Sequence, residues 1–152
     1  DVYKRQILVS AGLETTVQSD EGHISASTQA FVADKIGEMG VWYRLAEAAF
    51  VGGSLVGIGG HNPYEAARLD CTIIHGPYIE NFEQDYASFH DQNAALLVTT
   101  PNDLAMAVLS ADKDSLQENA RTLLENAFQP VQDCANDLIT LLSQNEKSAG
   151  VA

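Results

Sequence analysis

The stretch "FVGGSLVGIGGHNPYEAA", residues 50–67, decides how the fold of this chain is interpreted. An apolar run leads into five glycines, and a helix-like segment follows. In open parallel sheets, ligands bind beyond the carboxyl ends of the strands, where a loop enters the next helix. Glycines let the main chain approach a ligand and adopt positive φ, and the free amides at a helix start favour an anion. The stretch therefore predicts a buried strand, an anion-binding loop and a helix.

The end of this stretch also has a purely structural explanation. Asn62 as N-cap, Pro63 at the first helical position and Glu65 at the third resemble a capping box. Capping does not explain the glycines, each of which costs roughly 0.5–1 kcal/mol relative to alanine in regular structure. Glu65 could also accept hydrogen bonds from a diol such as a ribose. One carboxylate oxygen could serve each role, so both interpretations stay open.

The common phosphate-binding motifs are absent. "GIGGHN", residues 57–62, lacks the last glycine of a GxGxxG fingerprint, and no GxxxxGK occurs. A dinucleotide fingerprint and a P-loop are therefore both excluded.

Outside this stretch, the hydrophobic pattern alternates between short β-branched runs and helical segments. Trp42, Leu45, Ala46 and Ala49 lie at i, i+3, i+4 and i+7 and predict a helix with one apolar face. We predict strands at 14–19, 30–34, 48–53, 71–77 and 94–100, a helix ending near 13, and helices at 62–70, 81–93 and 113–144, the last broken by Pro130. This alternation predicts an α/β fold with a Rossmann-like parallel sheet flanked by helices, followed by C-terminal helices. We expect one domain over residues 1–144 and a flexible tail over 145–152.

Composition limits the kinds of ligand. The chain has 152 residues, of which 45% are apolar and 19% charged, as expected for one globular domain. Eight basic and 21 acidic side chains give a net charge of −13, which argues against nucleic acid and anionic membranes as partners. Any phosphate must then be held mostly by backbone amides. Cys71 and Cys134 lack the spacing of a disulfide or zinc framework, so we expect buried free thiols in a reducing compartment.

Two longer runs resemble a known family. "GEMGVWYRLAEAAFVGGSLVGIGGHNPYEAA" (37–67) and "IIHGPYIENFEQ" (73–84) closely resemble the C-terminal half of the 3-deoxy-D-manno-octulosonic acid (Kdo) transferases, bacterial enzymes of lipopolysaccharide core assembly. The likeness runs from about Ala11 to near Leu142. Its strongest motifs are Phe50 to Ser54, Gly59 to Pro63 with Glu65, and Gly76-Pro77 followed by Asn81-Phe82.

The resemblance implies a two-domain GT-B glycosyltransferase, of which this chain would be the second, nucleotide-sugar-binding domain. Such enzymes transfer Kdo from CMP-Kdo to a lipid A precursor, with inversion and without a cofactor or an essential metal. The full-length enzyme works at the cytoplasmic face of the bacterial inner membrane. Its general base, acceptor surface and membrane anchor belong to the N-terminal domain. We therefore expect a soluble fragment without catalytic residues, inactive alone, that meets lipid A and the membrane only through that missing domain.

The resemblance also assigns the donor site. The segment expected against the CMP moiety is Ile36, Gly37, Glu38 and Met39. Ser54 and the turn Gly59, Gly60, His61 would lie near the phosphate of the donor. Asn62 and Glu65 would hold the phosphate and ribose side of the donor. Two positions depart from the family. Lys35 stands where threonine usually follows Asp34, and Tyr64 stands where leucine is frequent; neither change removes the site, and Lys35 could add a cation near the donor.

The histidines have more than one interpretation. A histidine such as His61 could act as an acid or base, but we favour a hydrogen-bond donor to the sugar nucleotide over a purely structural turn residue. His75 could line the same crevice, although a core histidine is favoured. His23 and His90 are expected to face solvent.

Other polar and aromatic side chains fit structural roles. Glu80, Glu83 and Asp85 resemble a metal site only superficially, and a solvated face is the favoured interpretation. Trp42 and Phe50 have a spacing that fits core packing better than base stacking.

Two other functions remain open beside the CMP-Kdo donor domain. A GT-B enzyme using a UDP- or GDP-activated sugar would prefer those nucleotides over CMP. A non-catalytic binding domain would retain the fold but bind no nucleotide. The presence of Asn62 and Glu65 together with the full glycine turn argues against the second alternative.

Overall fold

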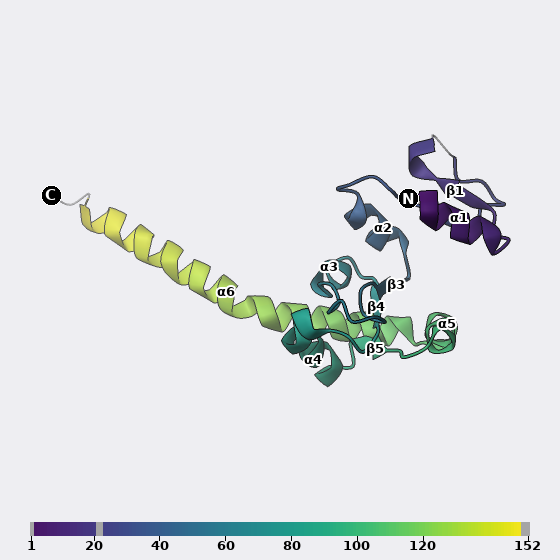
Figure 1. Ribbon diagram of the computed structural model, residues 1–152. Helices are drawn as coiled ribbons and strands as arrows, with labels where there is room; N and C mark the ends of the chain where they lie inside the picture. Colours follow the sequence, from purple (N-terminus) through teal and green to yellow (C-terminus); the bar gives the residue numbers. More distant parts are fainter. Residues whose placement is uncertain (1, 21–22, 150–152) are drawn as a thin grey trace. The chain divides into compact units, whose positions relative to one another are not determined.

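The computed structural model of the chain describes residues 2–20 and 23–149, and the side chains up to residue 141 (Figure 1). These residues form two compact units, Asp1–Met39 and Gly40–Ala152, which we call the first and second units. The expected single domain over 1–144 stays a prediction.

The described residues of the first unit form one α-helix and two short strands. Helix α1 covers Val2–Ser10, and strands β1 (Thr15–Val17) and β2 (Ala30–Val32) pair in parallel. A 3₁₀ turn, η1, follows β1 at Gln18–Asp20. Helix α1 packs on both strands. The strands predicted at 14–19 and 30–34 are confirmed, as is a helix ending just before residue 13.

The second unit contains a parallel sheet in the order β3-β4-β5. Its strands are β3 (Ala48–Val51), β4 (Thr72–His75) and β5 (Ala95–Leu97). The register places Phe50 opposite Ile74, and Ile74 opposite Leu96. All four residues of β4 are buried, as expected for the central strand of a covered parallel sheet. The predicted α/β class with a parallel sheet and flanking helices is confirmed.

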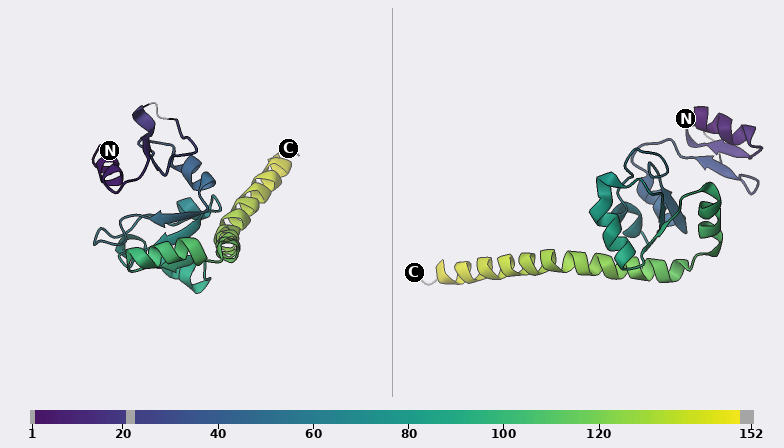
Figure 2. Two further views of the ribbon diagram at one scale, coloured as in Figure 1. Left: turned by 90° about the vertical axis from the view of Figure 1, so that its right-hand side faces the viewer. Right: turned by 60° about the horizontal axis from the view of Figure 1, so that its bottom comes forward.

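The described part of the chain around this sheet also forms five α-helices (Figure 2). In chain order they are α2 (Met39–Leu45, which begins at the last residue of the first unit), α3 (Tyr64–Ala67), α4 (Glu83–Asp91, preceded by the 3₁₀ turn η2 at Glu80–Phe82), α5 (Pro101–Ser110) and α6 (Lys113–Ala149). Helix α5 begins with a capping box, because Thr100 accepts from the Asp103 amide at 3.1 Å and Asp103 accepts from the Thr100 amide at 2.9 Å.

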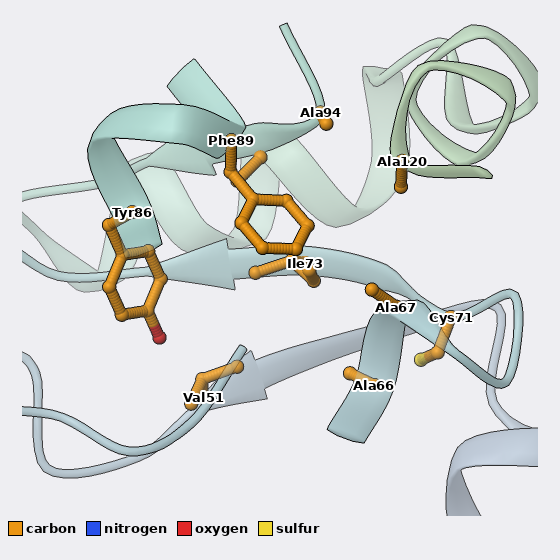
Figure 3. Packing of buried hydrophobic residues seen from close by; sticks show 10 residues of the cluster. Val51, Ala66, Ala67, Cys71, Ile73, Tyr86, Phe89, Ala94 and Ala120 are labelled. Atoms are coloured by element: carbon orange, nitrogen blue, oxygen red, sulfur yellow. The ribbon is translucent and has the colours of Figure 1, made fainter. Parts of the chain in front are cut away.

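The core of the second unit lies between the sheet and helices α3, α4 and α6 (Figure 3). Tyr86 and Phe89, three residues apart on α4, point their rings toward the sheet. The alanines of α3 are fully buried, which lets this short helix lie close against its neighbours. The cluster consists of Val51, Ala66, Ala67, Cys71, Ile73, Tyr86, Phe89, Ala94, Ala95 and Ala120.

Several helix boundaries differ from the sequence prediction. Helix α2 ends at Leu45, and Ala49 belongs to β3, so the apolar spacing across residues 42–49 combined two different elements. Trp42 and Phe50 are half-buried rather than fully in the core. Helix α3 is only four residues long; Asn62 lies outside it, and turns occupy residues 63 and 68–70 of the predicted 62–70 segment.

Pro130 does not break α6. The helix continues on both sides of it to Ala149, so it also extends into the region expected to be a flexible tail from residue 145. Residues 150–152 lie outside the described part. The prediction failed because an interior proline costs about 3 kcal/mol, which a long run of good helix formers can offset.

Candidate functional site

The glycine loop, residues 52–62, leaves the carboxyl end of β3 and lies against the loop after β4, residues 76–81. Three backbone amides of the β4 loop join the two loops. The Gly76 amide donates to Ser54 Oγ at 2.9 Å, the Tyr78 amide to Ser54 O at 3.0 Å, and the Asn81 amide to Gly59 O at 3.0 Å. The two loops therefore form one structure at the carboxyl edge of the sheet, where such folds bind ligands.

Ser54 links the ends of the two strands. Its side chain is fully buried, and its hydroxyl donates to Val51 O at 2.6 Å while accepting from Gly76 N. The hydroxyl of Ser54 thus uses its donor and one acceptor site on backbone groups, and these bonds stabilise the conformation of the glycine loop. A direct contact with phosphate, as the resemblance implies, stays a prediction.

Glycine is required at two positions of this structure. A Cβ at Gly76 would lie 2.1 Å from Ser54 O, an approach that only a missing side chain permits. Gly59 has φ +97°, and a Cβ there would lie 2.5 Å from Asn81 Nδ2. Gly76 thus allows backbone to pack closely on backbone, and Gly59 allows backbone to pack closely on a side-chain amide.

The glycine loop carries unused hydrogen-bond donors. The Gly60 amide donates to Gly53 O at 3.0 Å, but the amides of Gly59, His61 and Asn62 are among the loop amides that form no hydrogen bond within the described residues. Gly59 is buried, so an unpaired amide there is costly unless a ligand or water accepts from it. The anion-binding role expected from the sequence stays a prediction. Loop amides would take the main part in it, because α3 is too short to contribute a large dipole.

The first of the two contacts of the predicted capping box, made by the Asn62 side chain, is confirmed. Asn62 Oδ1 accepts from the Tyr64 amide at 2.9 Å, and Pro63 already has helical dihedrals, φ −73° and ψ −26°. The second contact is absent among the described residues, because no backbone amide donates to Glu65. Its carboxylate is exposed in the first turn of α3. Asn62 therefore keeps its Nδ2 group, and Glu65 its carboxylate, for another partner.

The other predicted donor residues belong to the first unit. Ile36, Gly37 and Met39 are exposed, and Gly37 has φ +92°. Glu38 accepts a hydrogen bond from Gln18 Nε2 at 2.5 Å. The predicted site residues therefore divide between the units, with Ile36–Met39 in the first and Ser54, the glycine turn, Asn62 and Glu65 in the second.

His75 is a buried core histidine, as favoured from the sequence. Its Nδ1 lies 2.7 Å from Gly76 O, and its Nε2 lies 2.9 Å from His90 Nε2. Because a carbonyl only accepts, Nδ1 of His75 carries the proton and Nε2 accepts from His90. Burial lowers the pKa of His75 to about 4, so this ring is neutral at ordinary pH.

The other histidines are less buried. The prediction for His90 was wrong, because it is half-buried against His75 instead of facing solvent, whereas His23 is exposed as expected. The exposed His61 has its carbonyl fixed by Tyr86, whose hydroxyl donates to it at 3.0 Å. Burial raises the pKa of Tyr86 well above its usual range, so this hydroxyl remains a donor.

The acidic and cysteine residues do not form a metal site within the described part of the chain. No group of three potential ligands is close together there, and Glu80 and Glu83 are exposed. Cys71 is buried, and burial raises the pKa of its thiol to about 11. The prediction of burial was wrong for Cys134, which is exposed on α6.

Sequence reasoning missed the roles of Asn81 and Tyr86. Asn81 stood inside one of the motifs, but its side-chain bond to Ile58 O at 3.2 Å could not be inferred without the loop conformation. For Tyr86, the sequence indicated only that the residue lies in a predicted helix. Both residues contact the backbone of the glycine loop, so they belong to the support of the site.

The fold and the loop define an α/β domain of the kind that binds ligands beyond the carboxyl ends of a parallel sheet. No model of a known protein family matches the chain. Curated relatives and a solved structure do. The 3-deoxy-D-manno-octulosonic acid transferase of Haemophilus influenzae is 32% identical over 95 residues, covering 62% of this chain and 22% of that protein. The enzyme of Rickettsia felis is 31% identical over 124 residues, covering 77% and 26%.

The structural comparison agrees with these relatives. The crystal structure of the C-terminal CMP-Kdo binding domain of WaaA from Acinetobacter baumannii has a TM-score of 0.73 and 34% identity, covering 79% of this chain and 65% of that one. The chain belongs to the 3-deoxy-D-manno-octulosonic acid transferase family and corresponds to its C-terminal part. It spans about a quarter of the length of the curated relatives it matches. Among the described residues, no helix combines the length and apolar character of a membrane span.

Proposed function

We propose that this chain is the donor-binding part of a Kdo transferase and that it binds CMP-Kdo. In this proposal the intact enzyme transfers Kdo to a lipid A precursor at the cytoplasmic face of the inner membrane. The general base and the acceptor surface belong to the remainder of the enzyme. The chain alone therefore binds the donor without transferring the sugar. Support comes from the similarity to a solved domain described as CMP-Kdo binding.

The observation that carries the proposal is the set of unused amides in the glycine loop. Gly59, His61 and Asn62 are among the loop residues whose backbone amides form no hydrogen bond within the described residues. With a net charge of −13, the chain has few side-chain cations that could hold a phosphate. Neutral backbone amides can bind the phosphate instead. We assign the donor phosphate to these amides.

Neighbouring side chains suit the rest of the nucleotide. The exposed carboxylate of Glu65 can accept from the ribose hydroxyls, as an acidic residue does in dinucleotide sites. The amide Nδ2 of Asn62 can donate to a phosphate oxygen, because Oδ1 is already used by the Tyr64 amide. Ile36–Met39, at the end of the first unit, is proposed to contact the CMP moiety.

The test is a calorimetric titration of the chain with CMP, with UMP and GMP as controls. We expect selective binding of CMP in the millimolar range or tighter. An Asn62→Ala, Glu65→Ala double variant should lose it. A matched Asn119→Ala, Glu125→Ala variant removes the same two groups from α6 and should bind as the unaltered chain does. Preference for UMP or GMP would indicate a different sugar nucleotide, and no binding by a folded chain would contradict the proposal.

A further inference from the structure

We propose that Asn81 is a positioning residue of the donor-phosphate site, which holds the Gly59 amide in the orientation that binds the phosphate. The inference rests on the proposed function of the glycine loop. It adds a residue from the β4 loop that has no assigned role in binding.

Asn81 holds two consecutive peptide groups of the glycine loop. Its side-chain Nδ2 donates to Ile58 O at 3.2 Å, and its backbone amide donates to Gly59 O at 3.0 Å. A single residue thus fixes the carbonyls on both sides of the Gly59 Cα. Elsewhere in the loop, the turn is held by the Gly60 amide, which donates to Gly53 O at 3.0 Å.

Peptide planarity converts this contact into an orientation of the amides. In a trans peptide the carbonyl and the N–H of one unit point in opposite directions. Because Ile58 O points at Asn81, the N–H of Gly59 points away from Asn81. This is the buried amide that lacks an acceptor among the described residues. Asn81 therefore determines the direction in which a phosphate-binding donor is presented, without touching the phosphate.

Among the described residues, Asn81 forms the one hydrogen bond to the Ile58–Gly59 peptide itself, while the neighbouring Ile58 amide donates to Val56 O at 2.6 Å. Gly57, Gly59 and Gly60 surround this peptide, and glycines can rotate into conformations closed to other residues. A Cβ at Gly59 would lie within 3.0 Å of three atoms of the Asn81 side-chain amide. Glycine is thus required at position 59, because the side-chain amide of Asn81 packs against the backbone there. The same Asn81 side chain restrains the flexible backbone at Gly59.

The test compares the binding of CMP and cytidine to Asn81→Leu. Leucine has a similar branched shape but no hydrogen-bond donor. The matched control is Asn119→Leu, since Asn119 Nδ2 also donates to a backbone carbonyl, that of Asn93, at 3.1 Å. We expect Asn81→Leu to weaken CMP binding about tenfold, the effect of one misaligned hydrogen bond to a charged group. Cytidine, which lacks the phosphate, should bind Asn81→Leu as it binds the unaltered chain.

The outcomes separate the two proposals. If the unaltered chain binds CMP and Asn81→Leu weakens CMP and cytidine equally, or neither, the positioning role is refuted while the proposed function stands. If the unaltered chain binds no CMP, both are refuted. Should Asn81→Leu fail to fold, the unaltered chain provides a second measurement by NMR. CMP should move the Gly59 amide proton downfield and leave the Asn81 side-chain amide unchanged. A shift of the Asn81 side-chain protons as large as that of Gly59 would indicate direct contact and overturn the positioning role.

Discussion

Substitution of Gly76 by alanine should strongly destabilise the second unit. Gly76 follows β4, where its Cα lies against the backbone of the glycine loop. An added Cβ would lie 2.1 Å from Ser54 O, 2.4 Å from Ser54 C and 2.8 Å from Leu55 N. All three are backbone atoms close to β3, so no side-chain rotation relieves the clash. The two loops must separate.

The cost follows from the bonds that join these loops. Separation breaks the bond from Gly76 N to Ser54 Oγ at 2.9 Å and the bond from Tyr78 N to Ser54 O at 3.0 Å. Two hydrogen bonds contribute about 2 kcal/mol in net stability. Overpacking adds roughly 1–3 kcal/mol. The expected loss is therefore about 3–5 kcal/mol, a large part of the roughly 5–15 kcal/mol that stabilises a typical domain.

The assay is urea denaturation followed by circular dichroism, with Gly57→Ala as the matched control. A Cβ at Gly57 meets nothing within 4 Å, and Gly57 does not have positive φ. Its substitution should change the free energy of unfolding by no more than about 0.5 kcal/mol. A loss below about 1 kcal/mol for Gly76→Ala, or equal effects of both substitutions, would refute the contact between the two loops.

Three further predictions concern side chains of the second unit. Tyr86→Phe removes the hydrogen bond to His61 O and should cost about 1 kcal/mol in urea denaturation, and an unchanged midpoint would contradict that bond. Burial lowers the pKa of His75 to about 4 from 6.5, so between these pH values the unfolded chain binds more protons than the folded chain. The contribution of His75 to the free energy of unfolding should therefore be complete above about pH 6.5 and decrease as the pH drops, by about 2 kcal/mol at pH 5. His75→Gln should flatten this dependence, and an equal slope in both proteins would assign it to other groups. Finally, a thiol reagent should modify the exposed Cys134 rapidly and the buried Cys71, with its pKa raised to about 11, only on unfolding; two equally fast thiols would contradict the burial of Cys71.

The sequence predicted the order of elements well where local signals were strong. β-Branched runs closed by glycine or proline, such as residues 71–77, became strands. The α/β class followed from their alternation with helices. Boundaries failed where a short apolar spacing covered two elements, as it did at Ala49, and where helix propensity offset the proline at Pro130.

The candidate site was predictable in location but not in its supports. Glycine clusters indicated the loop, and the Asn-Pro pair indicated the helix start, which Asn62 caps. The contacts of Asn81 and Tyr86 with the loop are formed by residues more than 20 positions away in the sequence. No local pattern encodes such contacts, because they depend on which loops the sheet brings together.

The central claim is that the glycine loop binds the donor nucleotide through its unused amides. The most direct measurement is a map of backbone amide resonances while CMP is added to the chain. We predict that the Gly59, His61 and Asn62 amides show the largest saturable shifts. Shifts confined to the cleft lined by Glu47, Lys113 and Gln117, or no shifts in a folded chain at millimolar CMP, would contradict the claim.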